Sequence, residues 1–256
     1  MSSAMQAPNT LVEVLTTALP RFSRRNHAAL AHNLAGVWWG LRTAVLIDSC
    51  MLSEMEAQAL GRHLEGASLT VLYEPVSEQT LVADQALLKR CLCNHVSFVD
   101  VGGRRPVLLE APPPAFNTLV AQLTPARDPG FLSLSLPNPD TPQDLVPLVG
   151  FLLDYPVAYS VGASEDGRNC LGGVELCVVE ATLVGASTTR QRLLSFSYPI
   201  SLTLCADSRL DPDNIVSTLR SKLGARLAAA QEIYAELLGA VIEVDRRTVV
   251  LDQVAL

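Results

Sequence analysis

The sequence lacks the short motifs by which common nucleotide-binding and hydrolytic sites are recognised. It contains neither a G-x-x-x-x-G-K-S/T loop nor a G-x-G-x-x-G loop, the glycine-rich patterns whose backbone N–H groups hold phosphates. The stretch Gly162–Gly167 has one residue too many for the G-x-S-x-G turn of serine hydrolases, and Gly102–Gly103 alone predicts only a turn. We therefore expect no cofactor.

Basic charge and long apolar runs are also scarce. The chain has 19 Lys and Arg against 26 Asp and Glu, for a net charge of −7, whereas a nucleic-acid-binding surface gains its affinity from clustered Lys and Arg. The most apolar stretch, Leu145–Gly162, is interrupted by an aspartate and two prolines, and the start lacks the basic and apolar regions of a signal peptide. We expect a soluble protein with no nucleic-acid partner and no membrane partner, which leaves a protein partner open.

Patterned cysteines are missing as well. The six cysteines are scattered, and most lie in apolar runs, as buried free thiols do. This favours a reducing compartment, the cytoplasm or the nucleus. Three soft ligands do lie within five residues, at Cys91, Cys93 and His95. A structural zinc site usually takes four ligands in two pairs, and no second pair is present. We therefore predict no metal site, with these three residues as its only candidates.

What the sequence does contain is an alternation of buried strands and helices. Thr43–Asp48, Leu69–Tyr73 and Val96–Val101 are short, almost continuous apolar runs, the pattern of strands buried on both faces. Helical spacing over Ser53–Glu65 and Gln79–Leu92 predicts a helix after each of the first two strands. This order predicts parallel pairing in one sheet, with right-handed crossovers.

The last third of the chain has a different pattern. Gly173–Val184 and Arg190–Leu204 are long runs joined by a short loop, which predicts an antiparallel hairpin with one solvated face. Asp211–Leu238 has an N-cap residue and an apolar stripe, so it predicts a helix. Two further strands, Val241–Val244 and Thr248–Leu251, are expected to be joined by a polar turn. The whole predicts a mixed α/β fold of three layers, with parallel strands in the N-terminal half joined by antiparallel strands from the C-terminal third.

The predicted domain organisation is simple. Residues 1–10 are expected to be a disordered tail, and 11–256 a single α/β domain that opens with helical residues 11–41. Most of the 16 prolines lie between residues 106 and 156. Since proline lacks an N–H and fixes φ, this middle stretch is predicted to be irregular.

Two carboxylates and a thiol are the candidates for catalysis. Asp48 and Cys50 follow the first predicted strand, and Asp100 lies near the end of the third. In open α/β sheets, ligands bind beyond the carboxyl ends of the strands, where two carboxylates could hold a metal or act as a general base. The alternative is that these aspartates only cap turns or helices.

Three stretches of the later half resemble a known family. They are GFLLDYPVAYSV (Gly150–Val161), LSFSYPISL (Leu194–Leu202) and the C-terminal IEVDRRTVVLDQVAL. They resemble the uncharacterised animal protein family named after chromosome 1 open reading frame 74. The resemblance implies a domain of unknown function, and it implies no activity, cofactor or site residue.

Two hypotheses for function remain open. The absence of site motifs, the low charge and the proline-rich middle favour an intracellular interaction or scaffold domain. The alternative is an enzyme of unrecognised type, with its site at the carboxyl ends of the N-terminal strands. A pocket in which Asp48 and Asp100 converge would favour the enzyme.

Overall fold

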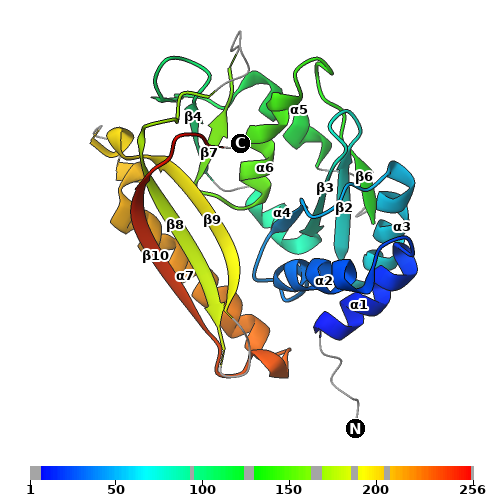
Figure 1. Ribbon diagram of the computed structural model, residues 1–256. Coiled ribbons are helices and arrows are strands. Elements are labelled where there is room, and N and C mark those ends of the chain that lie inside the picture. The colour runs from blue at the N-terminus through cyan, green and yellow to red at the C-terminus, as the bar shows by residue number, and fades with distance from the viewer. Residues whose placement is uncertain are drawn as a thin grey trace.

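The structure, a computed structural model, describes most of the chain. The described residues are 7–92, 95–123, 130–162, 169–185, 190–204 and 208–254. They form helices and strands in mixed order, with the strands distributed over three sheets (Figure 1). The mixed α/β class is therefore confirmed. The three-layer arrangement is not confirmed, because the strands do not form a single central sheet.

The first sheet has the strand order β1-β3-β2-β6. Its members are β1 (Ala44–Ile47), β2 (Leu69–Glu74), β3 (Gln79–Asp84) and β6 (Phe131–Ser133). β3 pairs antiparallel with both β1 and β2, and β6 pairs parallel with β2. β1 and β2 therefore run in the same direction, as expected, but β3 lies between them.

The other two sheets contain the remaining strands. β5 (Val107–Leu108), β4 (Ser97–Asp100) and β7 (Val157–Ser160) form the second, in which β4 is antiparallel to β5 and parallel to β7. The third has the order β10-β8-β9 and is antiparallel throughout. The prediction that the strand around Phe98 continues the sheet of β1 and β2 is therefore wrong.

In the third sheet, the predicted hairpin is present, but the last two predicted strands form a single strand. β8 (Glu175–Val184) and β9 (Gln191–Pro199) form the predicted hairpin. β10 is one continuous strand, Val241–Val250, rather than two strands and a turn. The charged residues read as a turn lie within it, because β10 is the outer strand and most of its residues are exposed.

Seven α-helices are described: α1 (Ala7–Ala18), α2 (Arg24–Trp38), α3 (Glu54–Leu64), α4 (Gln85–Cys91), α5 (Pro114–Gln122), α6 (Leu145–Leu152) and α7 (Pro212–Gln231). α1 begins inside the segment predicted as a tail, and α1 and α2 replace the single helical stretch over 11–41. Pro20 follows the end of α1, and the Ser23 hydroxyl accepts the Asn26 N–H to cap α2. Among the described residues, no helix has both the length and the apolar character that crossing a bilayer requires.

One predicted helix and the predicted irregular stretch differ from the structure. Gln79–Leu92 was expected to be one helix, but its first half is β3. The Asp84 carboxylate accepts the Leu87 N–H at 2.7 Å and begins α4 there. The proline-rich stretch 106–156 contains two helices, α5 and α6. Their prolines, Pro114 and Pro147, lie in the first turn of each helix, where no N–H is needed.

Successive strand residues point into different cores. In β2, Val71 packs with α1, α2 and α3, whereas Leu72 packs with α4, α5 and α6. In β4, Phe98 joins that second core, and Val99 joins a third core formed with the third sheet and α7. A period of two in a strand buried on both faces explains the continuous apolar runs.

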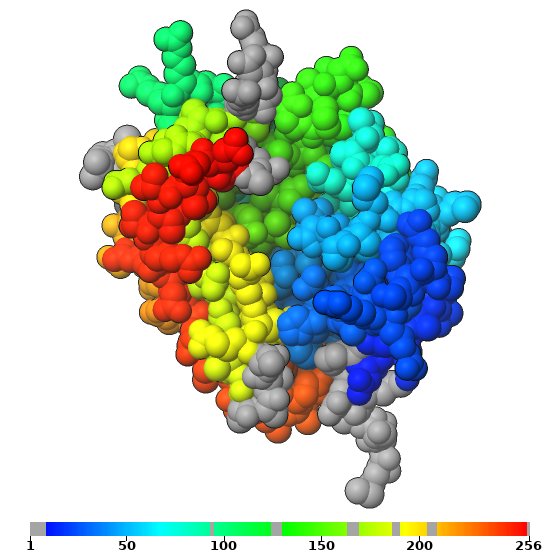
Figure 2. Space-filling model, in the orientation of Figure 1, coloured from blue at the N-terminus to red at the C-terminus, as the bar shows by residue number. Residues whose placement is uncertain are grey.

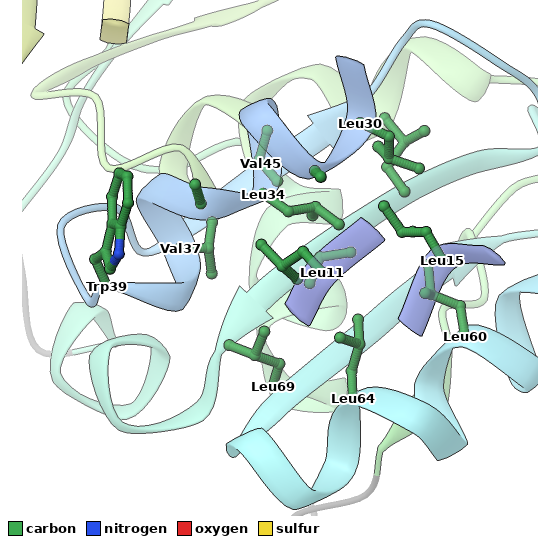
Figure 3. Packing of buried hydrophobic residues seen from close by; sticks show 14 of the residues in the cluster. Leu11, Leu15, Leu30, Leu34, Val37, Trp39, Val45, Leu60, Leu64 and Leu69 are labelled. Carbon is green, nitrogen blue, oxygen red and sulfur yellow. The ribbon is translucent and has the colours of Figure 1, made fainter. Parts of the chain in front are cut away.

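The first core joins the N-terminal helices to the first sheet. Leu11 and Leu15 of α1 lie among Leu34 of α2 and Leu60 and Leu64 of α3 (Figure 3). All five of these leucine side chains have no exposed surface. This core holds the N-terminal helices on one face of the first sheet and so fixes the position of β1.

Two glycines in helices provide a matched test of packing. A Cβ on Gly61 of α3 would lie 2.5 Å from the Gly130 carbonyl oxygen, whereas one on Gly224 of α7 would meet nothing within 4 Å. We expect Gly61→Ala to lower the free energy of unfolding by about 1–3 kcal/mol. Gly224→Ala should raise it by about 0.5–1 kcal/mol. Urea denaturation measures both, and an equal effect at the two positions would contradict this packing.

Candidate functional site

A buried carboxylate joins the N-terminal half of the chain to the C-terminal helix. Asp154 follows α6 with a φ of 67°, and it is only 7% exposed. Its Oδ1 lies 2.5 Å from Lys222 Nζ, and its Oδ2 lies 2.9 Å from Arg226 Nη2. Both cations come from α7. One negative charge is thus shared by two positive charges one helical turn apart.

The same carboxylate also receives donors from the N-terminal half. The Thr43 hydroxyl, just before β1, donates to Oδ2 at 3.2 Å. The Cys91 thiol, at the end of α4, lies 3.9 Å from Oδ1. Arg226 donates in addition to the Leu41 carbonyl at 3.2 Å. A buried charge is tolerated only when it is paired and its other lone pairs are satisfied, and here both conditions hold.

The residues beside Asp154 line a cleft. Leu153 and Tyr155 line two adjoining cavities, together with Leu46 of β1 and Ser195 of β9. One cavity is polar, about 380 Å³ in volume. The other is mainly apolar and measures about 330 Å³. In Figure 2 the yellow surface of β9 meets the blue N-terminal surface along this cleft.

A guanidinium without a partner lines the polar cavity. Arg42 lies between α2 and β1, and its side chain makes no hydrogen bond or ion pair with any residue that the structure describes. Burial lowers its pKa, Arg192 lowers it further, and Tyr155 and Asp48 raise it. An arginine remains charged even so. A positive charge therefore lines the cleft without a direct ion pair among the described residues, and Asp48 acts on it only across the cavity.

A glycine makes room for this arginine. A Cβ on Gly36 of α2 would lie 2.9 Å from Arg42 Cδ and 3.3 Å from Arg42 Cγ. The Gly36 carbonyl oxygen also accepts the Arg42 backbone N–H at 2.9 Å. The end of α2 therefore holds the Arg42 backbone, and the aliphatic stem of Arg42 packs against Gly36.

Two tyrosines supply neutral polar groups to the same cleft. Burial raises the pKa of Tyr155, and it raises the pKa of Tyr159 to about 12. Both phenols are therefore protonated at neutral pH. The Tyr159 hydroxyl lies 3.2 Å from Ser197 Oγ, which ties β7 to β9. The Tyr155 hydroxyl makes no hydrogen bond within the described part of the chain, so it can donate to a ligand.

The predicted catalytic candidates are not all in this cleft. Asp48 lines the polar cavity and is exposed. Cys50 is half-buried against the first core, and burial raises the pKa of its thiol, which disfavours the nucleophilic thiolate. Asp100 lies on the second sheet. Its Oδ1 accepts the N–H groups of Gly102 and Gly162, each at 3.0 Å, so it holds two loops together.

The three metal-ligand candidates occupy different surroundings. Cys91 is buried beside Asp154, whereas His95 is exposed and accepts a hydrogen bond from Arg209 Nη1 at 3.1 Å. Cys93 lies outside the described residues. Over the described ranges, no group of three His, Cys, Asp or Glu residues is arranged to hold a metal ion.

Sequence reasoning missed the central residues of this site. Asp154 appeared only as an interruption of the apolar stretch 145–162, although a carboxylate inside such a run is itself a signal of a buried ion pair. Arg42 and Tyr155 carry no local pattern at all. Their roles depend on contacts between segments that are far apart in the sequence.

Removing the charge of Asp154 tests the ion-pair network. Asp154→Asn keeps the shape of the side chain and tolerates positive φ, but it leaves Lys222 and Arg226 without a counter-charge. We expect a loss of about 3 kcal/mol in the free energy of unfolding. Glu243→Gln is the control, because its exposed pair with Arg190 should contribute less than about 1 kcal/mol. Similar losses for both variants in chemical denaturation would refute a central role for Asp154.

The chain was compared with known families and folds. No solved structure matches it. The sequence model of the family described as Domain of unknown function (DUF4504) matches residues 13–251, which includes every strand of the three sheets and every residue of the cleft described above except Val254. The chain therefore belongs to this family of domains of unknown function.

Proposed function

We propose that the protein is a binding domain, and that its ligand presents an anionic group to Arg42 in the cleft between β1 and β9. The observation that carries this proposal is the guanidinium that lines a polar cavity with no partner among the described residues. An isolated charge loses hydration on burial and regains little without a counter-charge. A carboxylate, sulfate or phosphate would supply that counter-charge in a two-pronged hydrogen bond.

The surroundings of Arg42 support an anion over a cation. Arg192 of β9 lines the same cavity, and its nearest carboxylate, on Glu180, is 3.9 Å away. The Tyr155 hydroxyl provides a neutral donor. Asp48 is the only acidic residue among those that line the cavity. The size of the cavity, about 380 Å³, suits a small ligand, since ligand pockets typically measure ~300–1,000 Å³.

The alternative is an enzyme whose site uses Asp48 and Asp100. Its support is that Asp48 lines the polar cavity. Against it, Asp100 lies on another sheet and holds the Gly102 and Gly162 amides. The binding domain is therefore our first proposal. A location in the cytoplasm or nucleus, a protein partner and membership of the animal family named after chromosome 1 open reading frame 74 are proposals that rest on the sequence.

An arginine that is held unpaired for a ligand should lower the free energy of unfolding of the ligand-free protein. We expect Arg42→Met to raise the free energy of unfolding by about 1 kcal/mol, because it removes a partly desolvated charge and keeps the aliphatic stem. Arg62→Met, on the exposed side of α3, is the control and should change stability by less than about 0.5 kcal/mol. Urea denaturation of the three proteins without added anions measures the effect. A clear loss of stability in Arg42→Met would show that the guanidinium has a structural partner.

Anion binding itself is tested on the same proteins. Millimolar sulfate or phosphate, at constant ionic strength, should raise the unfolding temperature of the natural chain and of Arg62→Met, because a ligand stabilises the folded state that binds it. The rise should be absent in Arg42→Met. An equal rise in all three proteins would reflect a general salt effect and would overturn the proposal.

A further inference from the structure

The polar cavity around Arg42 continues into a second cavity of different character. The two cavities share Leu46, Leu153, Tyr155 and Ser195, so a ligand anchored at Arg42 can extend past Tyr155. The second cavity has a volume of about 330 Å³ and is lined mainly by apolar atoms. An inorganic anion would occupy only the first cavity and would leave the second one filled with poorly bound water.

The second cavity lies between a helix and two strands. Val146 and Val149 line it from α6, Leu153 lines it from the residue after that helix, and Ala158 and Tyr159 line it from β7. The first three are half-buried. These side chains have neighbours on one side and open space on the other. Apolar ligand surface placed against them would therefore stabilise the complex by about 25 cal/mol for each Å² removed from water.

Aromatic rings form much of the wall. Tyr155, Tyr159 and Phe196 all line the cavity, and the rings of Tyr155 and Phe196 lie 5.4 Å apart with an angle of 31° between their planes. The Tyr159 hydroxyl is engaged with Ser197 at 3.2 Å, so that ring is held in place. Rigid aromatic walls favour a flat ring as ligand, because ring pairs add offset-stacked or edge contacts to simple burial.

We infer that the ligand of this cleft is an organic anion with an aromatic body, whose anionic group binds Arg42 and the Tyr155 hydroxyl while its ring lies in the cavity between α6 and β9. This inference rests on the proposed binding function and deepens it by naming the class of ligand. The ring and the anionic group belong to one molecule, since Tyr155 lines both cavities.

The test uses four probes and the full chain. 2-Naphthoate has both features, acetate has only the carboxylate, 2-naphthylmethanol has only the ring, and octanoate replaces the ring with a flexible chain. Isothermal titration calorimetry should show one 2-naphthoate site per chain. Its affinity should exceed that of each of the other three probes by about tenfold or more, which corresponds to ~1.4 kcal/mol.

Three variants locate the two halves of the site. Arg42→Met should abolish binding of acetate and reduce that of 2-naphthoate at least about tenfold. Val149→Trp fills the apolar cavity without adding to the polar one. It should remove the preference for 2-naphthoate and leave acetate binding unchanged. Val146→Trp fills the same cavity from one turn earlier in α6 and serves if Val149→Trp unfolds. Circular dichroism and thermal unfolding verify that each variant is folded.

The outcomes separate this inference from the function on which it rests. If acetate and 2-naphthoate bind equally, and both depend on Arg42, the anion site stands and the aromatic ligand is wrong. If octanoate binds with the same affinity as 2-naphthoate, the body of the ligand is not aromatic. If 2-naphthoate binds as well to Arg42→Met as to the natural chain, both the inference and the anion site are wrong. If the natural chain binds acetate but not 2-naphthoate, only the aromatic ligand is wrong, and if it binds neither, both are wrong.

Discussion

The arrangement of the whole chain depends on one buried carboxylate. Asp154 is buried where β1 begins, α4 ends and α7 passes. The three cores are joined by β2 and β4, each of which contributes to two of them. The ion pairs of Asp154 add a polar connection between α7 and the residues around β1 and α4. Its positive φ turns the chain sharply between α6 and β7. The neighbouring residues Leu153 and Tyr155 then line the cleft while Asp154 itself points inward.

Two local costs of the structure lie on either side of one contact, because Arg42 precedes Thr43 and the Thr43 hydroxyl donates to Asp154. A non-glycine residue at positive φ is unfavourable by about 1 kcal/mol or more, and Asp154 holds that conformation because four donors fix its side chain. Arg42 adds a half-buried guanidinium that makes no direct ion pair among the described residues. Natural proteins tolerate such local conflicts mainly at functional sites. Their position around one cleft is the reason for placing the site there rather than at the sheet edges.

The sequence was informative about elements and poor about their assembly. Strands around Val45, Val71 and Phe98, the hairpin of β8 and β9, and the capped helix α7 follow from periodicity and N-cap residues. The assignment of Phe98 to a second sheet does not, because an apolar run shows only that both faces are covered. β3 was hidden because its apolar residues lead directly into α4 across Asp84. Of the cleft, only Asp48 was predicted, since Arg42, Tyr155 and Asp154 meet through contacts between distant segments.

The outer strand of the third sheet shows how the chain manages its free edge. β10 is ten residues long, and one side of its backbone has no neighbouring strand in the described structure. Asp245, Arg246 and Arg247 lie in its middle and are exposed. Charged side chains on an edge strand oppose pairing with the same strand of another molecule. The charged residues that resemble a turn in the sequence therefore disfavour edge-to-edge association of β10 with another molecule, which is a route to aggregation.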